Sequence, residues 1–309
     1  MSIAFVFPGQ GSQQVGMMDG YADDRVVRGT FDEASAILGE DLWQLATEGP
    51  AEAQNLTRNT QPLLLTASVG IWRAWLAAGG AAPGYLAGHS LGEYSALVAA
   101  GALAFRDAVP LVRFRAEAMQ DAVAAGIGAM AAVVGGDDEA IAKACAEAAE
   151  GEVVEPVNYN APGQIVIAGH RAAVERAMKA AKAHGAKRAM LLPVSAPFHS
   201  SLLAPAAARL AGRLADVAFA VPSIPVVHNV DVGRHDDAAA IRDALARQAA
   251  SPVRWTETLR FLVANGVTSV VECGPGRVLA GLARRVDDSL ATYSLTDAAA
   301  LAEARAALA

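Results

Sequence analysis

The sequence predicts an α/β protein in which a doubly wound parallel sheet carries a small inserted subdomain. Apolar strands at residues 3–7, 224–230 and 267–271 alternate with helical segments, which is the order of a parallel sheet with helices on both faces. Between residues 128 and 192 the order changes to strand, helix, strand, strand, helix, strand. This is the ferredoxin-like split βαβ order, and it indicates a separate compact unit.

Each element of the inserted unit has a local signal. Strands are expected at residues 129–134, 153–158, 164–168 and 187–192, and helices at 137–149 and 171–184. Asp137 stands where a helix start is expected, and Gly185 stands where a helix ends. We therefore expect a small ferredoxin-like subdomain at residues 127–193. Residues 1–126 and 194–309 would form the large subdomain, with a substrate cleft between the two.

The most informative motif is Gly88-His89-Ser90-Leu91-Gly92, which matches Gly-x-Ser-x-Gly. In α/β-hydrolase-like sheets this pattern presents a nucleophilic serine on a sharp turn between a strand and a helix. A strand at 85–87 and a helix of small residues at 93–100 flank the motif here. The glycines are required because a Cβ at either position would collide with the neighbouring helix or strand. Acyl transfer through Ser90 is the leading hypothesis, and His89 is expected to point away from it and to pack.

Composition argues against several classes of protein. A formal net charge of −7 without a basic tract argues against a nucleic-acid partner. The N-terminus has no leader pattern and no apolar run approaches membrane-spanning length, so we expect neither export nor a membrane partner. Cys145 and Cys273 give no disulfide framework, which agrees with a cytoplasmic location.

A base is needed, because a serine hydroxyl becomes a good nucleophile when its proton is taken as it attacks. His199 is the candidate, since it lies in a proline-bracketed loop and follows the serine in the chain order of α/β hydrolases. His228, on an apolar stretch, is the alternative base. No acidic residue occupies an obvious third position of a Ser-His-Asp triad.

Further motifs lie along the whole chain. They are Phe5-Val6-Phe7-Pro8-Gly9-Gln10-Gly11-Ser12-Gln13, Arg115 ahead of Met119-Gln120, Asn158-Tyr159-Asn160-Ala161-Pro162-Gly163-Gln164, Ser195-Ala196-Pro197-Phe198-His199-Ser200, Gln248 ahead of Ser251-Pro252-Val253-Arg254-Trp255, and Glu272-Cys273-Gly274-Pro275-Gly276. In this order and spacing, with the Ser90 motif, they closely resemble the malonyl-CoA:acyl carrier protein transacylases. These are acyltransferases that load malonyl groups for fatty acid synthesis.

For catalysis, the resemblance implies a Ser90–His199 dyad in which the backbone carbonyl of Gln248 orients the histidine. The amide of Leu91 is one expected donor to the oxyanion by the geometry of the turn, and the amide of Gln10 is the second by resemblance. Without a carboxylate neighbour, His199 is expected to stay neutral and available near pH 7.

For the substrate, Arg115 matches the arginine that binds the malonyl group in the family. A malonyl thioester ends in a free carboxylate, which a guanidinium can bind through two hydrogen bonds while it stays charged. Phe198 is expected beside the malonyl α-carbon, because Phe at this position accompanies malonyl in related polyketide acyltransferases. Asn160 and Gln10 are further expected substrate contacts.

The resemblance implies a malonyl-CoA:acyl carrier protein S-malonyltransferase that works by a ping-pong mechanism through malonyl-Ser90. Malonyl-CoA and acyl carrier protein are the expected partners, and no metal or redox cofactor is expected. The alternatives are a malonyltransferase of malonate decarboxylation or polyketide assembly, a serine hydrolase, and a noncatalytic carrier-binding module. Basic residues that could meet an acidic carrier are Lys187, Arg188, Arg277, Arg284 and Arg285.

Overall fold

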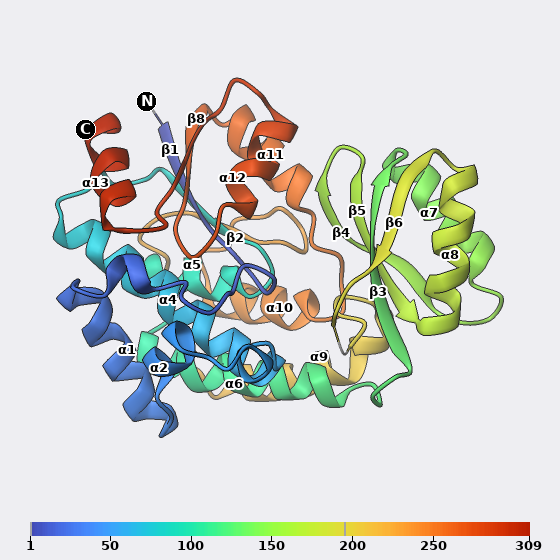
Figure 1. The fold of residues 1–309 in the computed structure, drawn as a ribbon, viewed down its shortest axis with the longest axis horizontal. Coiled ribbons are helices and arrows are strands. Elements are labelled where there is room, and N and C mark those ends of the chain that lie inside the picture. Colours follow the sequence, from blue (N-terminus) through green and yellow to red (C-terminus); the bar gives the residue numbers. More distant parts are fainter. Residues whose placement is uncertain (1, 195) are drawn as a thin grey trace.

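The computed structural model describes residues 2–194 and 196–309, so residue 195 of the motif before His199 lies outside the described residues. It contains a five-stranded sheet and a four-stranded sheet (Figure 1). In the described part of the chain, no helix is both long and apolar enough to cross a membrane.

The five-stranded sheet is parallel throughout. Its strands, in spatial order, are β7 (Val226–Val227), β2 (Tyr85–Gly88), β1 (Ser2–Phe7), β8 (Val267–Glu272) and β9 (Ala291–Ser294). Phe5 and Phe7 of β1 face one apolar core, and Ala4 and Val6 face another. Because both faces are covered, β1 is apolar at every position from Ile3 to Phe7 rather than at alternate positions.

Helices cover both faces of this sheet. One core holds side chains of α1 (Arg25–Leu38), α2 (Leu42–Thr47), α4 (Thr57–Ala77), α5 (Gly92–Ala99), α6 (Phe105–Asp121), α9 (Ala204–Ala215), α10 (Ala238–Gln248) and α13 (Ala298–Ala307). The other holds those of α11 (Trp255–Ala264) and α12 (Val278–Val286). The short helices are α3 (Ala51–Gln54), η1 (Asp19–Tyr21) and η2 (Ser201–Leu203).

The four-stranded sheet is antiparallel. Its spatial order is β4 (Val154–Ala161), β5 (Gln164–His170), β3 (Gly128–Gly135) and β6 (Ala186–Leu191). Helices α7 (Asp138–Ala148) and α8 (Arg171–Ala183) pack on its outer face. Figure 1 shows α6 leading from the larger part of the molecule towards β3. The opposite face packs on the end of α6, where Met130 and Val166 share a core with Met119 and Phe198.

Most predicted elements are confirmed within one to three residues, and their ends have the expected causes. The Asp137 side chain accepts a hydrogen bond from the amide of Ala140, which caps α7. Gly185 follows α8 with a φ of 89°, a left-handed conformation that glycine adopts without strain.

The predicted strand at 224–230 was wrong in extent, because only Val226 and Val227 pair with β2. The chain turns after Val227, and the His228 amide donates to the Gly233 carbonyl. This turn directs His228 and Asn229 towards the base of the Ser90 motif, where their side chains find polar partners.

Candidate active site

Ser90 lies on a strained turn between β2 and α5, with a φ of 53°. The backbone is crowded on both sides. A Cβ on Gly88 would lie 1.9 Å from the carbonyl carbon of Gly92, and a Cβ on Gly92 would lie 2.0 Å from the carbonyl oxygen of Phe7. The expected need for glycine at both positions is therefore confirmed, and the turn presents the serine hydroxyl at the carboxyl end of the sheet.

His199 lies beside the serine. Its Nε2 is 2.7 Å from Ser90 Oγ, and its Nδ1 is 2.9 Å from the backbone carbonyl oxygen of Gln248. Because a carbonyl only accepts, Nδ1 carries the hydrogen, which leaves the Nε2 lone pair facing the serine hydroxyl. Burial, and secondly the charge of Arg115, lower the pKa of His199 from 6.5 to about 3. The imidazole is therefore neutral at pH 7.

His228, the alternative base, lies elsewhere. It is fully buried, and its Nδ1 is 2.7 Å from Glu93 Oε1. Glu93 is the second residue of α5 and lies behind the Ser90 turn. No hydrogen bond joins His228 to Ser90 within residues 2–194 and 196–309, so this histidine supports the turn rather than facing the hydroxyl.

Arg115 is buried in α6 although most arginines on amphipathic helices are exposed. Its Nη2 donates to Ser90 Oγ at 3.1 Å and to Gln248 Oε1 at 2.8 Å, and its Nη1 donates to Gln61 Oε1 at 2.8 Å. Burial lowers the pKa of Arg115, but a guanidinium stays charged at this site. All of these acceptors are uncharged, so the structure provides a buried cation beside the serine.

The other two arginines of this helix do not line the cavity at Ser90. Arg113 forms a two-point ion pair with Glu40, at 2.9 and 2.6 Å. The Arg106 side chain is 80% exposed. Arg115 is therefore more deeply buried than Arg113 and Arg106, although all three lie on one helix.

A cavity of about 100 Å³ joins these groups. Ser90, His199, Arg115, Gln10 and Leu91 line it, together with Phe198. In the described ranges, the backbone N–H groups of Gln10 and Leu91 have no protein acceptor. Residues that sequence reasoning missed also line the cavity, namely Gln61, His89, Met119, Met130, Asn158, Leu192 and Val194. Met130 and Asn158 belong to the antiparallel sheet, so the cavity lies between the two sheets.

His89 departs from the expectation that it only packs. Its ring does pack edge-on against Trp255, with centroids 5.4 Å apart. The same ring lines the cavity, and its Nε2 is 2.8 Å from Asn160 Oδ1. Asn160 itself does not line the cavity and approaches it only through His89, whereas Asn158 lines it directly. The register of β4 shifts between Pro156 and Asn158 and between Tyr159 and Ala161, so the alternation of a regular strand does not tell which of the two asparagines lines the cavity.

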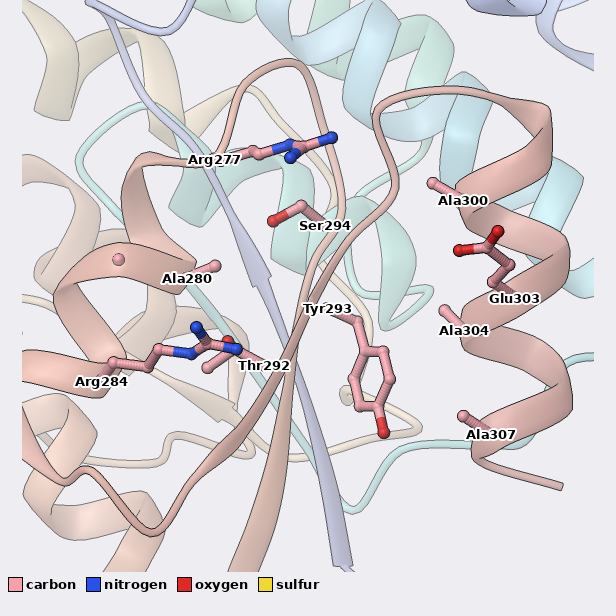
Figure 2. Close-up of a pocket in the computed structure, with 11 residues that line it drawn as sticks. Arg277, Ala280, Arg284, Thr292, Tyr293, Ser294, Ala300, Glu303, Ala304 and Ala307 are labelled. Carbon is pink, nitrogen blue, oxygen red and sulfur yellow. The ribbon is translucent and has the colours of Figure 1, made fainter.

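A larger groove, of about 530 Å³, lies along the edge strand β9 between α12 and α13 (Figure 2). Arg277 and Arg284 line one side of it, and Glu303 lines the opposite side. It shares no lining residue with the Ser90 cavity. Of the other basic residues expected to meet a carrier, Lys187 and Arg188 are exposed on β6.

Comparison with known proteins agrees with this geometry. The acyl transferase domain family matches residues 4–301. The malonyl CoA-acyl carrier protein transacylase of Salmonella typhimurium is 58% identical over 302 residues, which cover 97% of this chain and 98% of that protein.

Solved structures are equally similar. The acyl-carrier-protein S-malonyltransferase of Burkholderia pseudomallei has a TM-score of 0.98 at 59% identity and covers 99% of this chain and 100% of that one. A malonyl-transacylase solved in complex with a type II polyketide acyl-carrier protein has a TM-score of 0.98 at 52% identity. The match covers 99% of this chain and 100% of that one. The chain therefore belongs to the acyl transferase family, and within it to the malonyl CoA-acyl carrier protein transacylases.

Proposed function

We propose that this protein transfers the malonyl group of malonyl-CoA to the phosphopantetheine thiol of acyl carrier protein through malonyl-Ser90, and so supplies extender units for fatty acid synthesis. One observation carries the proposal. Ser90 Oγ lies 2.7 Å from the neutral base His199 and 3.1 Å from the buried cation Arg115. A nucleophile and a carboxylate-binding group are thus adjacent, as malonyl requires, because one CH₂ separates its thioester carbonyl from its carboxylate.

In the first half-reaction, Ser90 Oγ attacks the thioester carbonyl carbon while its proton passes to His199 Nε2. The unpartnered amides of Gln10 and Leu91 would hold the oxyanion. The carbon–sulfur bond then breaks, the proton on His199 passes to the sulfur, and CoA leaves malonyl-Ser90 behind.

The second half-reaction repeats these roles. The carrier thiol gives its proton to His199 Nε2 as its sulfur attacks the ester carbonyl carbon. The bond from carbon to Ser90 Oγ breaks, and the proton returns to Oγ. All of these steps are supplied by side chains and amides of the chain, so the proposed reaction needs no metal or redox cofactor.

Substrate choice rests on Arg115 and Phe198. A carboxylate bound to Arg115 also offsets the positive charge that helps to lower the pKa of His199, so malonyl binding would strengthen the base. Phe198 lines the cavity beside His199 and would limit space at the malonyl α-carbon. Asn160 would act by holding His89 at 2.8 Å.

The proposal includes the domain organisation. Residues 1–126 and 194–309 would form an α/β-hydrolase-like, doubly wound subdomain, and residues 127–193 a ferredoxin-like insertion. The sheet order β4-β5-β3-β6 with two helices on one face supports the second assignment. Two observations support a cytoplasmic location. The proposed substrates are malonyl-CoA and acyl carrier protein, and both cysteines are free, as is usual in a reducing compartment.

The decisive test is the intact mass of the protein after mixing with malonyl-CoA. We expect a single malonyl adduct on Ser90, because both half-reactions pass through that ester. Ser90→Ala should show none. Transfer to the carrier without an adduct, or an adduct on another residue, would contradict the mechanism. Rapid loss of the adduct to water without a carrier would favour a hydrolase.

The pH profile of the free enzyme tests the state of His199. Since burial and Arg115 lower its pKa to about 3, the base stays deprotonated until the pH falls far below the ordinary value of 6.5. The acid limb of kcat/KM for acetyl-CoA should therefore lie well below pH 6.5, and Arg115→Met should move it upward by removing a positive charge. The measurement is acetyl transfer between about pH 4 and 8. A wild-type limb near the ordinary histidine value would refute the assignment.

A further inference from the structure

A buried carboxylate lies behind the Ser90 turn and takes no part in the proposed proton transfers. Glu93 is fully buried, three residues after the nucleophile in the first turn of α5. Its Oε2 accepts hydrogen bonds from the Asn229 amide and from Gln248 Nε2, both at 2.9 Å. Its Oε1 is paired with His228 Nδ1 at 2.7 Å. Three partners on two other segments therefore hold this carboxylate in one place.

Gln248 connects this carboxylate to the reacting groups. Its backbone carbonyl accepts from His199 Nδ1 at 2.9 Å. Its side-chain Oε1 accepts from Arg115 Nη2 at 2.8 Å, while its Nε2 donates to the Ser90 carbonyl and to Glu93, both at 2.9 Å. A guanidinium can only donate and a carboxylate can only accept, so the amide has one possible orientation. One residue thus contacts the base, the nucleophile and the cation.

The hydrogen bond between Arg115 and the Gln248 amide affects how the guanidinium can bind a substrate carboxylate. Within residues 2–194 and 196–309, no carboxylate pairs with its guanidinium directly, and the Gln248 amide stands between Arg115 and Glu93. A direct ion pair would occupy the donors and offset the charge that a malonyl carboxylate needs. An intervening amide fixes the guanidinium by hydrogen bonds and keeps its charge available.

We propose that Glu93 and the side-chain amide of Gln248 are positioning residues that hold Arg115 in the pose that accepts a carboxylate, and that they set the preference for malonyl without touching it. This inference rests on the proposed function, because it assigns the support of the same site. It separates two roles of Gln248. The backbone carbonyl orients His199, and the side chain orients Arg115.

The test is the ratio of kcat/KM for malonyl-CoA to that for acetyl-CoA. Gln248→Met keeps the backbone carbonyl and removes both Oε1 and Nε2 of the side-chain amide. It should lower the ratio at least roughly tenfold, mainly by raising the KM for malonyl-CoA, and should affect acetyl transfer less. Gln54→Met is the matched control. Gln54 is also a buried glutamine, and its side chain donates to the Leu45 carbonyl at 3.2 Å rather than bonding to Arg115. Its ratio should not change.

Glu93 is tested by two substitutions. Glu93→Gln keeps an acceptor for Gln248, and its new amide can donate to His228 once that ring moves its hydrogen to Nε2, which has no partner now. The ratio should stay within about threefold of wild type. Glu93→Leu removes the acceptor and should lower the ratio at least roughly tenfold. Should Glu93→Leu fail to fold, Gln248→Met still tests whether the amide positions Arg115.

The double variant Arg115→Ala/Gln248→Met completes a double-mutant cycle. Once the guanidinium is gone, Gln248→Met should not lower the malonyl-to-acetyl ratio further. An unchanged ratio in Gln248→Met, or equal losses for malonyl and acetyl, would overturn this inference while the proposed function stands. The proposed function itself would fail if malonyl-CoA left no adduct on Ser90 of the wild-type protein.

Discussion

Replacement of His199 by alanine is expected to lower the rate of malonyl transfer by about 10² to 10⁴-fold. The imidazole Nε2 of His199 is 2.7 Å from Ser90 Oγ, whereas His89, the other histidine that lines the cavity, has its Nε2 2.8 Å from Asn160 Oδ1. Both half-reactions need this base, so acylation by malonyl-CoA and transfer to the carrier should slow together. Single-turnover kinetics of each half-reaction measures the effect.

Two histidines serve as controls for this prediction. His184 pairs with Glu147 outside the cavity, so His184→Ala should leave the rate unchanged. His228→Ala should lose less than His199→Ala, because His228 contacts Glu93 and not the serine. Equal losses at His199 and His228, with circular dichroism showing intact folds, would mean that the base is misassigned.

Arg115→Ala is expected to lower the ratio of malonyl to acetyl transfer by at least roughly tenfold, since a charge-assisted pair in a dry site contributes about 1.5 to 3 kcal/mol. The side chain is buried and its Nη2 lies 3.1 Å from the nucleophile, so a carboxylate bound there is within reach of the acylated serine. Acetyl transfer should fall far less, because acetyl has no carboxylate to lose. Rates with the two CoA thioesters provide the measurement.

Lysine at the same position refines this result. Arg115→Lys restores the charge without the planar fork, and a single Nζ replaces the two nitrogens that now bond Gln61 and Gln248 separately. It should recover only part of the preference. Arg113→Ala is the matched control on the same helix, because Arg113 pairs with Glu40 away from the cavity. A ratio that Arg115→Ala leaves unchanged would show that another group binds the carboxylate.

Several features of the molecule follow from short stretches of sequence. The five residues around Ser90 encode a strand, a tight turn and a helix start, because only glycine fits beside Phe7 and within the turn. The Asp137 cap and the Gly185 helix end are equally local. The order of strands and helices between residues 128 and 192 predicted the second sheet, since each element carries its own apolar pattern.

Family resemblance, rather than periodicity, led to His199, Gln248 and Arg115. Ser90 and His199 are 109 positions apart, and Gln248 lies a further 49 positions along the chain. Nothing local distinguishes Arg115 from Arg113 on the same helix, although Arg115 is fully buried beside Ser90 and Arg113 forms a partly buried ion pair with Glu40. Burial of a polar side chain depends on what the rest of the fold places over it.

By itself, then, the sequence determined the turn at Ser90, the helix caps and the alternation of strands and helices, because those depend on the conformational preferences of neighbouring residues. Only the tertiary structure decided that β7 stops after Val227, that His89 lines the cavity, and that Glu93 is joined to Arg115 through Gln248. The physical reason is that buried polar groups must find partners wherever packing brings them. Their hydrogen bonds are therefore a property of the assembled fold rather than of any one segment.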